Sequence, residues 1–207
     1  MNLAEELGRG LSRIGLALTP ETQQKLLDYV ALLAKWNKVH NLTAVREPAR
    51  MVSHHLLDSL VVVPYLQGAM IVDVGSGGGL PGIPLALVKP EWQVTLLEAN
   101  QKKAAFLRQV LIELKLANVQ VVCERVESWR PEKKFEIVIS RAFADIVKFV
   151  QLAGHLCAPQ GRLYAMKGVM PLAELAQLPE GVTVEQVVAL DVPQLDAERH
   201  LVVMKLN

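Results

Sequence analysis

Apolar side chains recur at intervals of three to four residues along the first third of the chain, as they do on one face of an amphipathic helix. The first such stripe consists of Leu26, Tyr29, Val30, Leu33 and Trp36. It follows Thr19-Pro20, where threonine can cap a helix and proline can occupy its first turn. A second apolar stretch starts at about residue 48 and ends before residue 64. The pattern predicts a small helical region over residues 1–66 that packs on a core.

After residue 66 short apolar runs alternate with amphipathic stretches, which is typical of successive βαβ units in a parallel sheet. Strands are predicted over residues 70–74, 94–98, 119–122, 135–140, 162–166, 182–190 and 201–206. Helices are predicted over residues 81–89, 101–116, 143–156 and 171–177. Residues 67–207 are therefore expected to form an α/β domain, and the lack of a flexible linker places the helical region directly on it.

Length and charge narrow the possible classes of protein. A chain of 207 residues, of which 51% are hydrophobic, can bury one sizeable core. Its formal net charge of +1 lacks the basic excess that would by itself indicate a nucleic-acid binder. A local excess of positive charge does occur between residues 35 and 50. The charged residues there are Lys35, Lys38, Arg46 and Arg50, with Glu47 as the single acid. Any affinity for RNA must therefore be local.

The sequence contains neither a transmembrane pattern nor a metal-binding one. No apolar run approaches the roughly 20 residues that cross a bilayer, and the N-terminus does not resemble a signal peptide. We expect a cytoplasmic protein without a membrane partner, and a monomer is the default. Cys123 and Cys157 have no CxxC partner and no clustered histidines nearby. They are expected to be buried free thiols, and no bound metal is predicted.

A glycine-rich segment follows the first predicted strand and precedes a predicted helix. It contains Gly75, Gly77 and Gly79. Glycines permit positive φ and carry no Cβ, so a ligand can approach the main chain at the carboxyl end of the strand. Glu98 ends the next strand, 23 residues after Gly75, which is about the spacing at which an acid receives the hydroxyls of a ribose. Together the loop and the acid predict a nucleoside-binding site.

Two classes of enzyme fit such a site. The run from Gly77 to Gly82 also satisfies the GxGxxG pattern of dinucleotide-binding enzymes, so hydride transfer is the rival. The chain lacks a second substrate domain, however, and Tyr164 and Lys167 lie on a predicted strand with one residue too few between them for a helical Tyr-x-x-x-Lys pair. Asp73 could approach the methionine end of S-adenosylmethionine, and Val126-Glu127 its adenine. These features favour a methyltransferase.

Several short motifs, taken in order along nearly the whole chain, resemble the RsmG family, which is also called glucose-inhibited division protein B. They are Lys35-Trp36-Asn37-Lys38, Asn41-Leu42-Thr43, His55-Leu56-Leu57-Asp58-Ser59, Val72-Asp73-Val74-Gly75-Ser76-Gly77, Gly79-Leu80-Pro81-Gly82-Ile83-Pro84, Ser140-Arg141-Ala142, Lys167-Gly168 and Arg199-His200-Leu201. Members of this family methylate N7 of a guanine in small-subunit ribosomal RNA. Any one fragment could be accidental, but the ordered set is specific.

The resemblance implies a Rossmann-like class I methyltransferase with a seven-stranded, mostly parallel sheet. It also implies S-adenosyl-L-methionine as cofactor and a guanine in the decoding-region loop of small-subunit ribosomal RNA, or of the small ribosomal subunit, as substrate. By motif, the cofactor contacts would be Gly75, Leu80, Val126, Glu127 and Arg141. The physical argument adds three cofactor-binding residues, Gly77, Gly79 and Glu98.

Methylation of guanine N7 needs no general base, because N7 keeps an exposed lone pair in the neutral base. Orientation of the two reactants is then the main requirement. Arg141, after the fourth predicted strand, is the best candidate at the junction of cofactor and substrate, where its planar guanidinium could meet a carboxylate, a phosphate or guanine O6. The alternative for Arg141 is a structural salt bridge. Phe143 is expected to pack in the core more readily than to stack on a base.

Five basic residues are predicted to bind RNA phosphates: Lys35, Lys38, Lys167, Arg199 and His200. A solvated surface without a partner is the alternative for the lysines. Two further functions stay open at this point. One is methylation of a small molecule, which the near-neutral charge permits, and the other is a non-catalytic module that binds nucleotides or RNA. The intact glycine loop and Glu98 count against the second.

Overall fold

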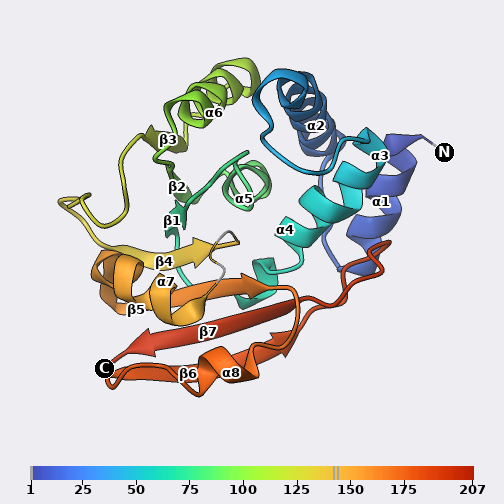
Figure 1. The fold of residues 1–207 in the computed structure, drawn as a ribbon. Coiled ribbons are helices and arrows are strands. Elements are labelled where there is room, and N and C mark those ends of the chain that lie inside the picture. Colours follow the sequence, from blue (N-terminus) through green and yellow to red (C-terminus); the bar gives the residue numbers. More distant parts are fainter. Residues whose placement is uncertain (1, 142, 144) are drawn as a thin grey trace.

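One mixed sheet carries the fold in a computed structural model of the chain, which describes residues 2–141, 143 and 145–207 (Figure 1). Within these residues seven strands lie in the order β3-β2-β1-β4-β5-β7-β6. Their bounds are β1 Met70–Val74, β2 Gln93–Leu97, β3 Val119–Val122, β4 Phe135–Ser140, β5 Cys157–Lys167, β6 Val182–Ala189 and β7 His200–Leu206. The first five strands are parallel, and β7 is antiparallel to both β5 and β6. The predicted α/β class is confirmed.

Most predicted strands agree with the structure within one residue, but β5 starts five residues earlier than expected. Its first part contains Pro159-Gln160-Gly161, which is typical of a turn. The register between β4 and β5 shifts at this point, where Cys157 pairs with Phe135 and Arg162 pairs with Ile137. A Cβ on Gly161 would lie 2.6 Å from the Phe135 carbonyl, so glycine permits the close approach of an irregular strand.

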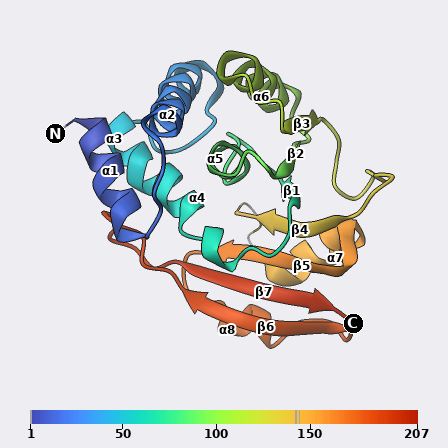
Figure 2. The ribbon, with the colours of Figure 1, turned by 180° about the vertical axis from the view of Figure 1, so that it is seen from behind.

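One side of the sheet is covered by the N-terminal helices together with two later ones. The longer α-helices of this group are α1 (Leu3–Arg13), α2 (Pro20–His40), α5 (Gly82–Val88) and α6 (Gln101–Leu114), and Figures 1 and 2 show them gathered on one side. Thr19 caps α2 as predicted, because its hydroxyl accepts a hydrogen bond from the Thr22 N–H at 3.2 Å. Leu33 of α2 and Phe106 of α6 belong to one buried cluster with Ile71 of β1. The N-terminal helices and the sheet thus share a core.

The segment from about residue 48 to before residue 64 is not the single regular helix that its apolar pattern predicts. It is divided into α3 (Pro48–Met51), a π-helical turn (Val52–Leu57), α4 (Asp58–Leu60) and a 3₁₀ turn (Val63–Tyr65). In the π-helical turn the Asp58 N–H donates to the Ser53 carbonyl, five residues back. Such a turn adds a residue to one helical repeat, which apolar periodicity does not reveal.

The other face of the sheet is covered by α7 (Ile146–Ala153), with α8 (Leu172–Leu175) packed beside it. Phe149 of α7 joins Val72 and Leu163 in a second buried cluster. Both helices are shorter than predicted, and α7 ends in a 3₁₀ turn, Gly154–Leu156. Ala142 of the Ser140-Arg141-Ala142 motif and Ala144 of the predicted helix lie outside the described residues. Among the described helices none has the length and apolar character needed to span a bilayer.

Candidate functional site

The glycine-rich turn lies at the carboxyl end of β1, over the end of β2. The N–H groups of Gly75 and Ser76 both donate to the Leu97 carbonyl, at 2.8 and 3.2 Å. Gly77 adopts a φ of +57°, in the left-handed region. Among the described residues, a Cβ on Gly77 would meet only the Gly75 carbonyl oxygen, at 3.8 Å. Packing therefore does not explain this glycine, and the open space above it is available to a ligand.

Gly79 and Leu80, also predicted to contact the cofactor, have a packing role in this structure. A Cβ on Gly79 would lie 2.6 Å from Cγ1 of Ile83 and 3.0 Å from Cδ2 of Leu107. Leu80 is buried in the cluster beneath the N-terminal helices. Close packing of α5 against the loop thus requires a glycine at position 79, and contact of either residue with a cofactor stays a prediction.

Glu98 is held beside the glycine loop by two main-chain hydrogen bonds. Its Oε2 accepts from the Gly77 N–H and its Oε1 from the Asn100 N–H, each at 2.8 Å. A carboxylate offers about four lone pairs, so these two bonds leave acceptor capacity for two hydroxyl groups. The side chain is largely buried but borders a cavity. This arrangement fits the predicted recognition of a ribose, which stays a prediction.

A cavity of about 150 Å³ brings four of the predicted cofactor residues together. Gly75, Glu98, Val126 and Glu127 all line it. Phe143 lines the same cavity, and its ring also packs against Phe149 with centroids 5.2 Å apart. Phe143 therefore makes the predicted packing contact, and stacking on a base, its alternative, stays a prediction.

Asp73 is fully buried directly before the glycine loop. Its Oδ2 accepts a hydrogen bond from the Gly82 N–H at 2.9 Å, whereas Oδ1 has no partner among the described residues. Burial raises the pKa of this carboxyl to about 7, although the bond from Gly82 and the charge of Arg141 oppose the rise. A hydrogen-bond donor at the methionine end of the cofactor, direct or through a water, fits the unpartnered oxygen.

Tyr29 of α2 contacts the glycine loop through its hydroxyl. Its buried hydroxyl donates to the Gly78 carbonyl at 2.6 Å. The sequence analysis placed Tyr29 in an apolar stripe and missed this contact. The available signal was chemical, because a buried tyrosine usually has a hydrogen-bond partner for its hydroxyl.

A second cavity, of about 340 Å³, lies at the carboxyl ends of β4 and β5 and contains Arg141. Nη1 of Arg141 lies 3.0 Å from Oδ2 of Asp58 and 3.0 Å from the His54 carbonyl oxygen. Nε of Arg199 lies 2.8 Å from the other oxygen of Asp58. Arg141 thus forms the salt bridge that was its alternative interpretation, but at the wall of a cavity. Asp58, which joins both arginines, was assigned no role from the sequence.

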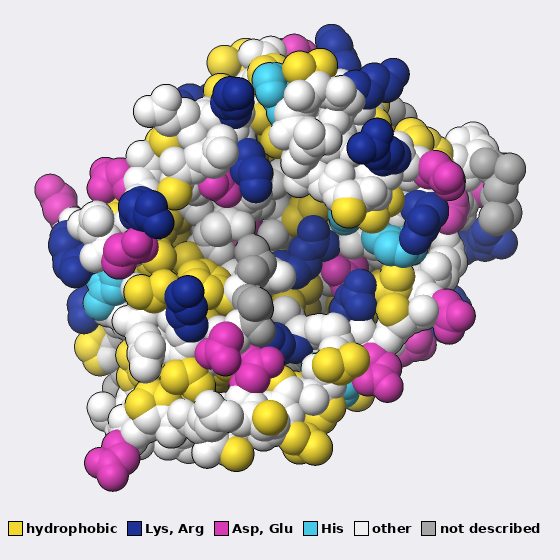
Figure 3. All heavy atoms as spheres, in the orientation of Figure 1, with side chains coloured by type: hydrophobic (Ala, Val, Ile, Leu, Met, Phe, Trp, Pro, Cys, Tyr) yellow, Lys and Arg dark blue, Asp and Glu magenta, His cyan; other side chains and the backbone are white. Residues whose placement is uncertain are grey.

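Three of the five predicted RNA-binding residues gather at this second cavity. Lys167 and Arg199 line it, and Nδ1 of His200 lies 3.1 Å from the carbonyl oxygen of Gly168, another lining residue. Lys167 is paired with Glu174 of α8 at 2.9 Å. Figure 3 shows Lys and Arg side chains around a hollow near the carboxyl end of β4 and the start of α4.

The other two predicted residues, Lys35 and Lys38, line a separate cavity of about 580 Å³ together with Arg46. A short loop separates the two cationic cavities, because Val45 lines one and Arg46 the other. Asn37 fixes this loop through the Thr43 N–H at 2.9 Å and the Val45 carbonyl at 3.3 Å. The predicted basic residues therefore form two neighbouring groups.

Two histidines at the second cavity are shifted toward the neutral form. Burial lowers the pKa of His55 to about 4, with a further contribution from the charge of Arg141. Its Nε2 lies 2.8 Å from the hydroxyl of Thr43. Burial also lowers the pKa of His54, and the charge of Arg50 acts in the same direction. Near neutral pH the positive charge of this cavity comes from its arginines and Lys167.

The two cysteines differ from each other, which corrects one expectation. Cys157 is buried, and burial raises the pKa of its thiol to about 11. Cys123 is half-exposed because it directly follows β3, at the edge of the sheet. Neither thiol lines the cavities that contain Glu98 and Arg141.

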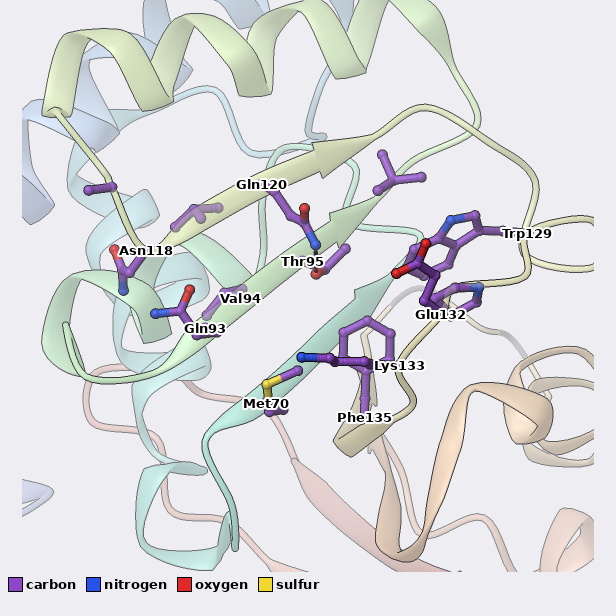
Figure 4. A pocket seen from close by; sticks show the side chains of 14 residues that line it. Met70, Gln93, Val94, Thr95, Asn118, Gln120, Trp129, Glu132, Lys133 and Phe135 are labelled. Carbon is purple, nitrogen blue, oxygen red and sulfur yellow. Dashed lines mark hydrogen bonds between the residues drawn. The ribbon is translucent and has the colours of Figure 1, made fainter.

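A larger cavity of about 600 Å³ lies away from these residues (Figure 4). It is lined by the amino ends of the strands, including Met70, Gln93 and Phe135, and by the face of β2 and β3. Gln120 donates to the hydroxyl of Thr95 at 2.8 Å within it. Ligands of open α/β sheets bind outside the carboxyl ends of the strands, so size alone does not make this cavity the candidate site.

The strand order, the glycine loop after β1 and the acid after β2 together define a class I methyltransferase. A solved S-adenosylmethionine-dependent methyltransferase from Aquifex aeolicus has this fold, with a TM-score of 0.61 and 18% identity over 84% of this chain and 98% of that one.

Sequence similarity identifies the family. The chain belongs to the rRNA small subunit methyltransferase G family, also called GidB, whose model matches residues 22–202. A relative named ribosomal RNA small subunit methyltransferase G, from Laribacter hongkongensis, is 57% identical over the whole of both chains. Another of that name, from Nitrosospira multiformis, is 56% identical over 99% of this chain and 98% of its own. The resemblance based on the ordered motifs is confirmed.

Proposed function

We propose that this chain transfers the methyl group of S-adenosyl-L-methionine to N7 of one guanine in the decoding-region loop of small-subunit ribosomal RNA. The observation that carries the proposal is the placement of two cavities along the same carboxyl edge of the sheet. One contains the ribose-type acid Glu98, and the other contains the cationic group around Arg141. The names of the relatives support ribosomal RNA as the substrate.

The cofactor would lie along the glycine loop, held by the chain's own groups. Glu98 would accept the ribose hydroxyls, and Val126 and Glu127 would border the adenine. Asp73 would receive a donor from the methionine end on its unpartnered oxygen. The bound cofactor supplies an electrophilic methyl group on a sulfonium. The task of the protein is then to hold that methyl group and the base in line, within about 3–3.5 Å of each other.

The target atom N7 agrees with the chemistry of the side chains near Arg141. Asp58 accepts hydrogen bonds from two arginines, so both its oxygens are already engaged. His55 has a low pKa, and its Nε2 is also engaged, in a hydrogen bond with the Thr43 hydroxyl. A nucleophile that needs no deprotonation, such as guanine N7, suits these surroundings, whereas an exocyclic amine or a ring carbon would need further assistance.

RNA phosphates would be held by the two cationic groups of residues already described. Lys35 and Lys38 would act in one cavity and Lys167 and Arg199 in the other, with His200 at its rim. Phosphate contacts of this kind fix the register of an RNA without reading its sequence. We further propose that the chain acts as a monomer in the cytoplasm, where its substrate is found.

The test is direct methylation. The protein is incubated with S-adenosylmethionine and small-subunit RNA or particles from cells that lack the enzyme, and 7-methylguanine is mapped by reductive strand scission. One new cleavage in the decoding-region loop is the expected result. Incorporation of the methyl group without scission would place it on another atom and refute N7. Cofactor binding without transfer to either substrate would refute the RNA assignment.

A further inference from the structure

Asp58 occupies an unusual position for an acid in an enzyme that binds RNA. Its side chain is only 2% exposed, and it follows directly after the π-helical turn Val52–Leu57. Its two oxygens each accept a hydrogen bond from a different arginine, Arg141 at 3.0 Å and Arg199 at 2.8 Å. These arginines follow β4 and precede β7, so Asp58 ties together three parts of the chain.

Hydrogen bonds hold both guanidinium groups in place but do not occupy all their N–H groups. Arg141 engages the carbonyl of His54 and Asp58 through Nη1, while Arg199 engages Asp58 through Nε and the Glu198 carbonyl through Nη1. Within the described residues no hydrogen bond occupies Nη2 of either arginine. Their side chains remain 25% and 24% exposed and line the same cavity. Two planar donors therefore face a common space.

The charges of this cavity favour an anion. Its lining residues include three cations, Arg141, Arg199 and Lys167, and one acid, Asp58. Lys167 is paired with Glu174, so the remaining excess is one positive charge, and the arginine pair carries it. Planar guanidinium groups that converge on one space match the oxygens of a phosphate or a carboxylate better than a single ammonium does.

We propose that the Asp58-linked arginine pair is an oxyanion site that receives a phosphodiester of the RNA beside the target guanine, and that Asp58 is the positioning residue of this site. This inference rests on the proposed RNA substrate. The methionine carboxylate of the cofactor has the same oxyanion chemistry and is the other source to be distinguished. Asp58 itself touches neither ligand and acts by holding the two guanidinium groups at a fixed separation.

For Asp58→Asn, the proposal and the change in charge alone predict opposite changes in RNA affinity. Asp58→Asn removes a negative charge from a cationic cavity, and by charge alone this would strengthen RNA binding. An amide can accept from only one of the two arginines, because its nitrogen is a donor, so one guanidinium would lose its position. We expect the dissociation constant for a small-subunit ribosomal RNA transcript to rise about tenfold, as for loss of one charge-assisted hydrogen bond.

The experiment measures three quantities on the full chain. Titration of the transcript gives RNA affinity at several salt concentrations, calorimetry gives cofactor affinity, and thermal unfolding reports the fold. Asp58→Asn and Arg199→Gln should both weaken RNA binding and lower the salt slope by about one phosphate contact. Cofactor affinity should change less than about twofold. The control is Glu185→Gln, which also breaks an arginine–carboxylate pair, with Arg162, but in the strands away from the cavity.

Each outcome decides the question. Unchanged or tighter RNA binding by folded Asp58→Asn protein would overturn the proposal. Loss of cofactor affinity with RNA binding intact would assign the pair to the methionine carboxylate instead. If Asp58→Asn does not fold, Arg199→Gln carries the test by the same criteria. RNA affinity is measured without methyl transfer, so this test can be interpreted even if the N7 assignment is wrong. A wild-type protein that binds no RNA would refute the proposed function itself.

Discussion

Gly77 combines a left-handed backbone with open space, which distinguishes it from the neighbouring glycine at position 79. Gly77→Ala should sharply weaken cofactor binding, because the added Cβ would project into the space that the nucleoside needs. The backbone strain of such a change costs about 1–2 kcal/mol by itself. Gly15→Ala is the matched control, since Gly15 has a φ of +72° and no atom within 4 Å of a Cβ.

Calorimetric titration with S-adenosylmethionine and thermal unfolding would be compared for the two variants. We expect both to lose similar stability and only Gly77→Ala to lose cofactor affinity. Equal cofactor affinity in both would mean that the nucleoside does not pass over Gly77.

Asp73 makes the stability of the cofactor-free protein depend on pH. Its pKa in the folded state, about 7, lies above that of an unfolded chain, so the folded state holds the proton more tightly. This contribution to stability is complete below about pH 4 and is lost as the pH rises through 7. His55 acts in the opposite sense over a similar range, because its folded pKa of about 4 is lowered. The wild-type curve should therefore be flatter than either contribution.

Asp73→Asn separates the two effects. The amide resembles the protonated carboxyl and keeps an acceptor for Gly82, so the variant should be more stable than wild type at pH 8 and similar near pH 4. The difference should grow by about 1.4 kcal/mol for each pH unit across the interval. Urea unfolding at a series of pH values measures it. A constant difference would mean that Asp73 is ionised throughout in the folded protein.

Single residues also mark the limit of inference from the sequence. The position of Glu98 beside the glycine loop could be predicted because its spacing from that loop follows from the local strand–turn–helix geometry, whereas its contact with a ribose stays a prediction. The role of Asp58 could not be predicted, because its arginine partners lie 83 and 141 residues away along the chain and the contacts depend on how these distant segments pack together. Arg141 was predicted to lie at the junction of cofactor and substrate, but its partner Asp58 could not be derived from spacing.

At the scale of elements, the strands were the most predictable part of the molecule. Strands such as β1 and β4 are buried along most of their length, so their apolar runs end where burial ends. The exceptions have local causes. The β5 strand begins in an irregular segment that contains proline and glycine, and the π-helical turn Val52–Leu57 keeps an apolar pattern that suits an ordinary helix as well.

The contact between α2 and the glycine loop provides a test at this scale. Tyr29→Phe would leave the buried Gly78 carbonyl without its donor, which costs about 1–3 kcal/mol of unfolding free energy. We propose that this loop supports the nucleoside, so the dissociation constant for the cofactor should also rise several-fold. Tyr164→Phe is the control, since that buried hydroxyl accepts from the Gln67 N–H at 3.2 Å and does not contact the loop.

Chemical denaturation and cofactor titration of both variants would show whether the two effects separate. A loss of stability in both with a loss of cofactor affinity only in Tyr29→Phe is expected. If the two variants bind the cofactor equally well, α2 supports the fold without setting the geometry of the loop.

For the whole molecule, the helical N-terminal region and the sheet share one continuous core, in which Leu7 and Leu33 lie with Ile83 and Leu96. The boundary at residue 66 stays a prediction, because a change in sequence pattern marks a change in element type without marking a separate unit of folding. The same arrangement brings Lys35 and Lys38 of α2 near the loop whose other side borders the cavity of Arg141. No local pattern in the sequence reports that proximity.

A near-neutral protein can bind RNA only if its cations are concentrated on one side. The salt dependence of RNA affinity in charge-removing variants measures this concentration. Lys35→Ala combined with Lys38→Ala should weaken binding to small-subunit RNA and lower the slope of log affinity against log salt by about 1.4–1.8, at about 0.7–0.9 for each phosphate contact. Cofactor affinity should be unchanged.

Lys133→Ala combined with Lys134→Ala removes the same charge at the amino end of β4, away from both cationic cavities. If both pairs lower the slope equally, the RNA responds to net charge alone and the residues of α2 form no specific contact. A lower slope only for the pair on α2 would show that the RNA extends from the cavity of Arg141 across the loop to the N-terminal helices, which gives that region a part in substrate binding as well as in the core.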